Sequence, residues 1–169
     1  MSATTQRDHV ANLAKRDSRK ALEQAQCIPD PWFRSQALAW VARFAEDNPV
    51  KIASLAATAA SKCDDEYQRT AARAWEIAAL AERKFVAEAI TGLRDAVNQS
   101  KSVTPLASRA EALVLLLHAA LRISDQDAKR VAYELKNSCG QDSHWRCKRA
   151  IRDAVELTEG TLKPRPFFW

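Results

Sequence analysis

Four copies of one short pattern follow one another along this chain, and they restrict its fold more than any other feature does. The first copy begins at IPDPWFR, Ile28–Arg34, and the second begins at CDDEYQR, Cys63–Arg69. Fainter copies occur at Val103–Leu117 and at Gln141–Leu157, and the N-terminal stretch TTQRDHVANLA holds half a copy. Internal repeats with a period of about 20–50 residues are typical of stacked architectures, in which each unit buries its apolar surface against its neighbours. The chain is therefore expected to form a stack of similar units.

The composition indicates which secondary structure the repeated units contain. Alanine accounts for 32 of the 169 residues and glycine for only 3, and runs of β-branched residues are absent. Alanine has the highest helix propensity, whereas sheet proteins need glycine-containing turns and alternating Val, Ile and Thr. The sequence therefore predicts an all-α fold.

Each unit is predicted to contain a short helix followed by a longer one, which we call helix B. In IPDPWFR, Pro29 and Pro31 end the short helix and start helix B, and Asp30 lies in the turn between them. The B helices are expected at about 31–46, 66–82, 104–121 and 143–158, and the short helices at about 18–27, 50–62, 84–97 and 125–137. We thus expect one α-helical repeat domain of about four to five antiparallel helix pairs, followed by an extended tail, at 1–159 and 160–169 respectively.

This arrangement resembles the α-solenoid families, HEAT-like repeats above all, with tetratricopeptide repeats as the second choice. The resemblance covers about residues 3–158 and rests on repeat length, helix pairing and an acid followed by an arginine. The first copy shows this pair as Asp30 and Arg34 and the second copy repeats it, whereas the third copy has Pro105 in place of the acid. The Trp-Leu-Gly-Tyr pattern of tetratricopeptide repeats is absent. The resemblance implies a right-handed α-solenoid and transfers no catalytic residue.

One arginine recurs near the start of every helix B. It has two interpretations: a structural ladder, in which each guanidinium binds a turn acid or carbonyl, and a row of cations that holds an acidic ligand or phosphates. Repetition at equivalent positions favours the ladder, because every unit needs the same contact. This arginine column consists of Arg34, Arg69, Arg109 and Arg146.

Large aromatic residues recur in the same way. Trp32 and Trp40 of the first copy align with Tyr67 and Trp75 of the second. Such rings are expected to fill the space between alanine-rich helices, and a binding platform of stacked rings is the alternative. The repetition again favours the structural interpretation.

The segment CGQDSHWRCKR contains the densest group of side chains that bind metals. Cys139, Asp142, His144 and Cys147 include no C-x2-C pair, so their spacing is a weak indication of a zinc site. A helix stop and an N-cap explain the polar residues between the two cysteines. We therefore predict no metal and no cofactor.

The last helix carries a basic stripe, although the net charge of +5 is otherwise spread along the chain. Such a stripe is the best candidate for contact with a phosphate or an acidic partner. The favoured alternative is a solvated cap, which terminal repeats need for solubility. The stripe consists of Arg146, Arg149 and Arg152.

The sequence contains no enzyme signature. There is no phosphate-binding glycine loop, no G-x-S-x-G and no H-E-x-x-H. His118 lies in an apolar run and is expected to be a core histidine with one satisfied nitrogen. No apolar run approaches the roughly 20 residues that span a bilayer, so we expect no membrane contact. The four cysteines lack a C-x2-C pair and indicate reduced thiols in the cytoplasm.

The last ten residues, GTLKPRPFFW, break the repeated pattern. Gly160 is expected to stop the final helix, and Pro164 and Pro166 force an extended path. Three aromatic residues follow, Phe167, Phe168 and Trp169. Because these rings would form a sticky patch in water, we expect them to fold back on the chain or to dock into another molecule, a second copy of the chain included.

The chain combines a repeat architecture with the absence of any catalytic motif. This combination predicts a non-catalytic interaction module that binds a protein or peptide partner on the solenoid surface. The alternative is a HEAT-like protein that binds nucleic acid through the arginine column and the basic stripe. The residues that we expect to contact a partner are Arg146, Arg149, Arg152, Phe167, Phe168 and Trp169.

Overall fold

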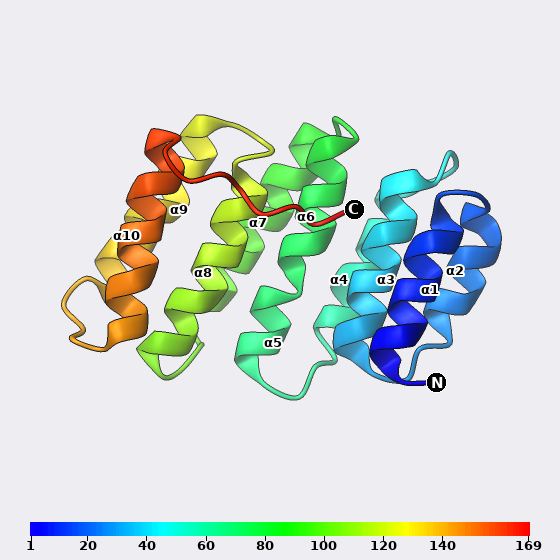
Figure 1. The fold of residues 1–169 in the computed structure, drawn as a ribbon, viewed down its shortest axis with the longest axis horizontal. Coiled ribbons are helices and arrows are strands. Elements are labelled where there is room, and N and C mark those ends of the chain that lie inside the picture. The colour runs from blue at the N-terminus through cyan, green and yellow to red at the C-terminus, as the bar shows by residue number, and fades with distance from the viewer.

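The computed structural model describes all 169 residues, and its secondary structure consists of α-helices without a strand (Figure 1). The all-α prediction is confirmed. None of the helices combines the length and the apolar character needed to cross a membrane. In chain order the helices are α1 (Ala3–Ala14), α2 (Ser18–Gln26), α3 (Pro31–Phe44), α4 (Pro49–Ala60), α5 (Glu66–Ala71), α6 (Arg73–Glu82), α7 (Val86–Ser100), α8 (Leu106–Ala120), α9 (Asp125–Cys139) and α10 (Trp145–Glu159).

The expected helices are all present, with ends that lie within a few residues of the prediction. The N-terminal half copy forms α1, and the four full copies supply their B helices as α3, as α5 with α6, as α8 and as α10. The second B helix differs from the prediction, because a turn at Ala72 divides it into α5 and α6. The helices α2, α4, α7 and α9 pack against these B helices. Since α7 and α9 have 15 residues each, as many as α8 and α10, the prediction that the first helix of a pair is the shorter one is wrong for these two pairs.

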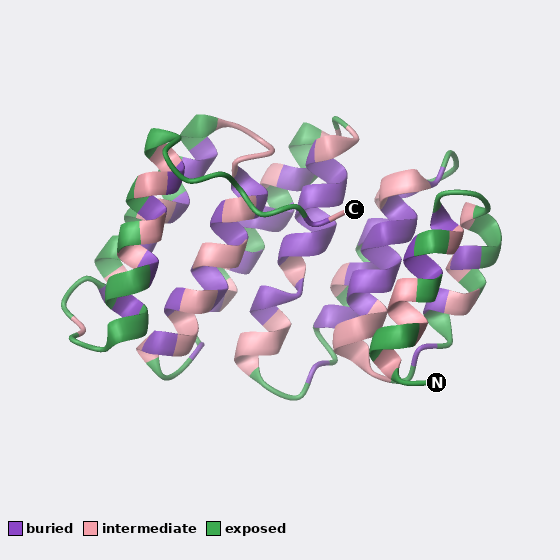
Figure 2. Cartoon of the chain, in the orientation of Figure 1, coloured by how far each residue is buried: buried purple, intermediate pink, exposed green.

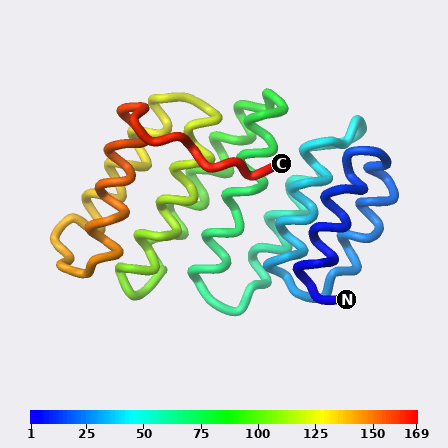
Figure 3. The backbone as a smooth tube through the Cα atoms, in the orientation of Figure 1, coloured from blue at the N-terminus to red at the C-terminus, as the bar shows by residue number.

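The helices form two layers, which can be followed in Figures 1 and 3. In one layer α1, α3, α6, α8 and α10 lie side by side, each in contact with the next. The other layer contains α2, α4, α7 and α9. This stack of similar helix pairs is consistent with a helical repeat. We call the outer surface of the first layer the helix-B face.

Small side chains allow the two layers to approach closely. Alanine makes up much of the buried surface of α3, α4 and α6, and the Ser35 hydroxyl of α3 donates to the Ala56 carbonyl of α4 at 2.9 Å. Trp40 is fully buried and Trp75 is 6% exposed, so this recurring aromatic position belongs to the core as predicted. The other recurring pair is only half-buried; it consists of Trp32 and Tyr67, which stack with ring centres 6.4 Å apart.

The stretch IPDPWFR covers the end of the turn between α2 and α3 and the first residues of α3, which begins at Pro31. The Asp30 carboxylate caps α3 by accepting the N–H of Trp32 at 2.8 Å, and Pro31 occupies the first turn, where a missing N–H costs nothing. Asp65 caps α5 in the same way. The recurring acid is therefore a helix cap and not the partner of the recurring arginine.

The arginine column stabilises three of these turns. In each, the guanidinium donates to the backbone carbonyl six residues earlier, which fixes the end of the preceding short helix against helix B. The pairs are Arg34 with Ile28 at 3.0 Å, Arg69 with Cys63 at 2.8 Å and Arg109 with Val103 at 3.1 Å. The structural ladder is confirmed for these three arginines. Arg146 departs from it, because none of the described hydrogen bonds starts from its guanidinium.

The last ten residues turn back along the helix-B face. Gly160 ends α10 in the left-handed conformation, with φ of 79°, which glycine adopts without strain. The chain then crosses α8 and α6 and ends near α3 (Figures 1 and 3). Residues 161–166 are exposed and Phe167 is buried, so the tail disappears into the protein only near its end (Figure 2). Of the two arrangements expected for the tail, the structure shows the one in which it packs on its own chain.

Candidate functional site

The residues predicted to contact a partner lie in two separate places. Arg146, Arg149 and Arg152 lie on α10, whereas Phe167, Phe168 and Trp169 contact aromatic residues of α6 and α3. Since α10 packs against α8 and α9, and not against α6 or α3, the two groups do not form one site.

Ion pairs occupy most of the basic stripe on α10. Arg149 pairs with Glu111 of α8, and Arg152 pairs with a carboxylate on its own helix at 3.2 Å. Arg146 forms no ion pair; its guanidinium carbon lies 5.4 Å from the ring centre of Trp145, which is 58% exposed. The stripe therefore offers one unpaired arginine beside an exposed ring, and not a row of three free cations.

The side chains between Cys139 and Cys147 have local structural roles. No group of three or more His, Cys, Asp or Glu side chains is placed to hold a metal ion. Instead, Nδ1 of His144 accepts the N–H of Arg146 at 3.2 Å and caps α10. Burial raises the pKa of the Cys139 thiol to about 11, so this thiol is protonated and unreactive at neutral pH.

Phe167 anchors the tail. Its side chain is 1% exposed, and its ring centre lies 5.3 Å from that of Trp75 in an edge-on arrangement. The guanidinium carbon of Arg122 lies 4.9 Å from the same ring centre. Full burial of a phenylalanine contributes about 1.5–3 kcal/mol, and an edge-on aromatic pair adds about 0.5–1.5 kcal/mol. We call the position between Trp75 and Arg122 the Phe167 seat.

Two side chains bind the backbone of the tail at Arg165. Its N–H donates to Nδ1 of His118 at 3.2 Å, and its carbonyl accepts from the guanidinium of Arg122. Pro164 and Pro166 have no N–H, and a residue that precedes proline is restricted to an extended backbone. The one N–H in this stretch is therefore bound. We call His118 and Arg122 the backbone clamp.

The end of the tail reaches the first helices of the stack. The rings of Phe168 and Trp169 both meet Trp40 of α3 edge-on, with ring centres 5.1 and 5.0 Å away. Lys15, directly after α1, donates to the carbonyl oxygen of Trp169. The tail thus connects the last helix of the stack with the first ones, across the helix-B face.

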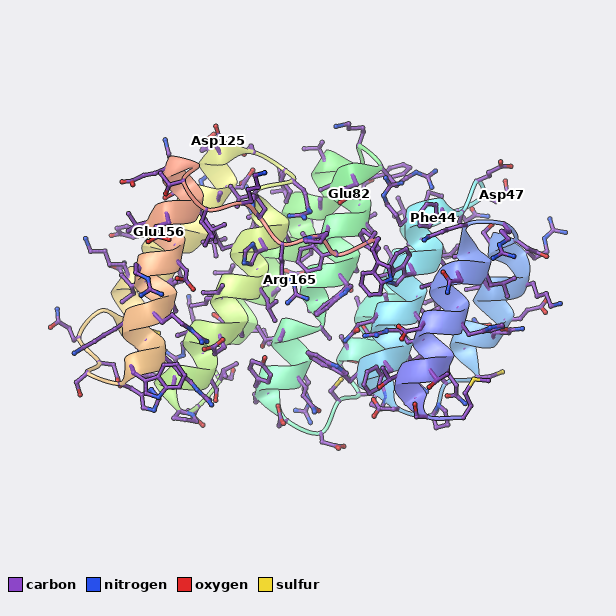
Figure 4. All side chains as sticks on the ribbon, in the orientation of Figure 1. Phe44, Asp47, Glu82, Asp125, Glu156 and Arg165 are labelled. Carbon is purple, nitrogen blue, oxygen red and sulfur yellow. The ribbon has the colours of Figure 1, made fainter.

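The backbone clamp requires a neutral His118 and a charged Arg122. Burial, followed by the charges of Arg165 and Arg122, lowers the pKa of His118 to about 4, so its Nδ1 is free to accept a hydrogen bond at neutral pH. Arg122 is held by Glu82, whose carboxylate lies 3.3 Å from it and also accepts from Arg43 of α3 at 2.6 Å. Figure 4 labels Glu82 and, on the tail, Arg165.

Sequence reasoning identified part of this site. The prediction of one satisfied nitrogen on His118 is confirmed, but the residue is half-buried and not in the core, and its partner in the tail was not predicted. Arg122 and Glu82 were missed, because each is an ordinary charged residue at the end of a helix and neither belongs to the repeated pattern. The only available signal was the tail itself, whose prolines and aromatic rings demand a surface on which to lie.

Comparison with protein-family models, with curated protein sequences and with solved structures gives no match to this chain. The geometry of the helix-B face is therefore the basis for assigning a function. That face combines an aromatic seat with side chains that bind peptide backbone, and both contacts suit an extended polypeptide.

Proposed function

We propose that this protein is a non-catalytic interaction module, a HEAT-like right-handed α-solenoid of one repeat domain that binds a protein or peptide partner on its helix-B face. One observation carries the proposal: the face holds an extended segment, residues 164–169 of the tail, by contacts of the kind that peptide-binding proteins use.

The contacts divide into two kinds with different roles. The backbone clamp of His118 and Arg122 binds groups that every polypeptide carries, so it contributes affinity without selecting a sequence. The Phe167 seat favours an aromatic side chain, because Trp75 meets the ring edge-on and the guanidinium of Arg122 lies over it. A solenoid offers a long surface on which several such contacts can follow one another.

Nucleic-acid binding is the second candidate function, and the feature that favours it is the exposed Trp145 with Arg146 and Arg149 on its ring. Aromatic rings and arginines together stack bases and neutralise phosphates. The arginine column contributes little to it, however, since three of its four members bind turn carbonyls. Peptide binding is therefore the function that the geometry supports better.

A peptide-display selection tests the proposal. The bait is the chain shortened to residues 1–163, which lacks the segment that covers the face, with helical content checked by circular dichroism. We expect enrichment of sequences with an aromatic anchor, and loss of that enrichment in Arg122→Gln. Arg152→Gln is the matched control, because Arg152 contacts neither Arg165 nor Phe167 and pairs with Asp153 on its own helix. A folded bait that enriches no sequence contradicts the proposal.

A further inference from the structure

We propose that the C-terminal tail is a displaceable internal ligand, and that the partner segment which replaces it has the chemistry of the tail: an extended stretch in which a proline precedes an aromatic anchor. This inference rests on the proposed function of the helix-B face. It adds the class of the partner segment and the device that controls access to the face.

The tail is attached to the rest of the protein by few contacts. Residues 161–166 are exposed, and within Pro164–Pro166 the protein binds only the backbone of Arg165 and the arginine side chain that lies 5.5 Å from the ring centre of Trp75. The buried part of the tail is one side chain, Phe167. The remaining contacts lie at the end of the tail, where Phe168 and Trp169 meet Trp40 and Lys15 binds the backbone of Trp169. Each of these contacts joins the tail to a helix and none joins one helix to another, so the tail can leave while the contacts between helices persist.

The chemistry of the seat defines what can replace the tail. Proline on both sides of the clamped residue removes two N–H groups that the face does not bind, and it keeps the segment extended before binding, which lowers the entropy cost of ordering. The seat takes an aromatic ring, since Trp75 and Arg122 present an edge-on ring and a cation to it. A second aromatic residue then contacts Trp40, as Phe168 does with its ring centre 5.1 Å from that of Trp40.

Linkage to the chain makes the tail a strong competitor. A segment on a short linker has an effective concentration of about 1 mM at its own site. Suppose that the free tail and the partner segment each bind the bare face with a dissociation constant of about 10 µM. The tethered tail, at about 1 mM, then weakens binding of the partner segment to the intact chain about 100-fold. A partner segment therefore gains access to the helix-B face only when the tail dissociates from it.

The alternative is that the tail is a permanent strap, as much a part of the fold as the helices. A strap and an internal ligand behave differently when the covalent linkage is cut. A strap stays bound after cleavage, or its loss unfolds the helices. An internal ligand dissociates on dilution and leaves the helices folded.

The experiment uses the full chain with a protease site inserted after the exposed Lys163, cleaved once the protein has folded. Size-exclusion chromatography and mass spectrometry measure retention of the tail fragment, and circular dichroism measures the fold. A labelled Pro164–Trp169 peptide then reports binding by fluorescence anisotropy. We expect the fragment to leave on dilution, the helical signal to persist, the peptide to bind the released core with micromolar affinity, and the uncleaved chain to bind it about 100-fold more weakly.

Three results overturn the inference: a fragment that stays bound at nanomolar concentration, a core that unfolds on losing it, or equal binding by cleaved and uncleaved chains. The peptide with Phe167→Ala is the control for the seat and is expected to lose binding. A folded core that selects displayed peptides of other chemistry, and does not bind the tail peptide, refutes this inference while the proposed function stands. A folded core that binds neither refutes both.

Discussion

The two ends of the B helices differ in how they use charged residues. At their N-terminal ends the same contacts recur: an acid caps the helix in the first two units, and an arginine binds the carbonyl six residues earlier in the first three. At their C-terminal ends the contacts are unique: Glu82 joins Arg43 to Arg122, and Arg122 with His118 holds the tail. Recurring residues build the stack and supply the rings of Trp40 and Trp75 to the candidate site, whereas the side chains that bind the tail backbone belong to no repeated pattern.

The largest effect is expected at Glu76, a residue that breaks the repeat inside the core. It is 3% exposed and lies where the first copy has the buried Val41. Burial raises the pKa of Glu76 from 4.5 to about 7, against the opposing effect of Arg73, whose guanidinium lies 2.6 Å away. Between these pH values the folded protein binds a proton that the unfolded chain has released, so the stability falls as the pH rises from 4.5 to 7.

Glu76→Gln is therefore expected to raise the free energy of unfolding at pH 8 by up to about 3 kcal/mol and to flatten its dependence on pH between 5 and 8. The amide oxygen still accepts from Arg73, so the variant does not orphan that cation. Urea unfolding of both proteins at pH 5 and pH 8 measures the difference. A variant that is less stable than the native chain at pH 8 would show that the ion pair outweighs the burial of charge.

The next largest effect on stability is expected within the arginine column, where Arg69 and Arg146 occupy equivalent positions with different contacts. Arg69→Ala leaves the carbonyl of Cys63 and the carboxylate of Glu66 without their partner and is expected to lower the free energy of unfolding by about 1–3 kcal/mol. Arg146→Ala, at the equivalent position, is expected to change it by less than about 0.5 kcal/mol, because Arg146 binds no carbonyl or acid. Thermal or urea unfolding distinguishes them. Equal losses would mean that the fourth unit uses its arginine as the others do.

Acid is expected to release the tail before it unfolds the helices. With the tail docked, the pKa of His118 is about 4; once the tail has left, we expect its pKa to return toward 6.5. The charged groups around His118 are Arg165, Arg122 and Asp153. Docking of the tail is thus complete above pH 6.5 and weakens as the pH falls from 6.5 toward 4. The NMR signal of the Arg165 amide, whose N–H donates to His118 in the docked tail, monitors the release. His118→Gln, which retains an acceptor but does not titrate, is expected to abolish the pH dependence.

Much of the stack could be predicted from the sequence, because repetition reports structure directly. The alignment of Trp40 with Trp75 located two core positions, and the column of Arg34, Arg69 and Arg109 indicated a ladder that the structure shows. The sequence left open whether each arginine binds a turn acid or a carbonyl; in the structure it binds a carbonyl, and Asp30 and Asp65 cap the helices. A cap and a salt-bridge partner look alike in sequence, since both are acids that precede helix B.

The candidate site could not be predicted in the same way. Residues His118 and Arg165 are 47 positions apart and belong to no common pattern, and their contact depends on the path of the tail over two helices. The composition of the tail predicted that its rings must be covered, but not by which surface. Long-range contacts between unrepeated residues leave no periodic trace.

The smallest expected effect is the binding of the protein to nucleic acid. If the helix-B face binds peptides and the basic stripe is mostly paired, the protein should show no measurable binding to single- or double-stranded DNA or RNA at about 50 mM salt. A gel-shift titration measures this. Binding that weakens steeply with salt, and that Arg146→Ala reduces, would instead support the second candidate function at Trp145.

The most direct test of the central claim is a calorimetric titration of the cleaved, tail-free protein with the peptide Pro164–Trp169. If the tail is an internal ligand, we expect one binding site per chain, a micromolar dissociation constant, and a large loss of affinity when either Phe167 in the peptide or Arg122 in the protein is replaced. A protein that keeps its helical structure without the tail and gives no heat of binding with this peptide would contradict the claim.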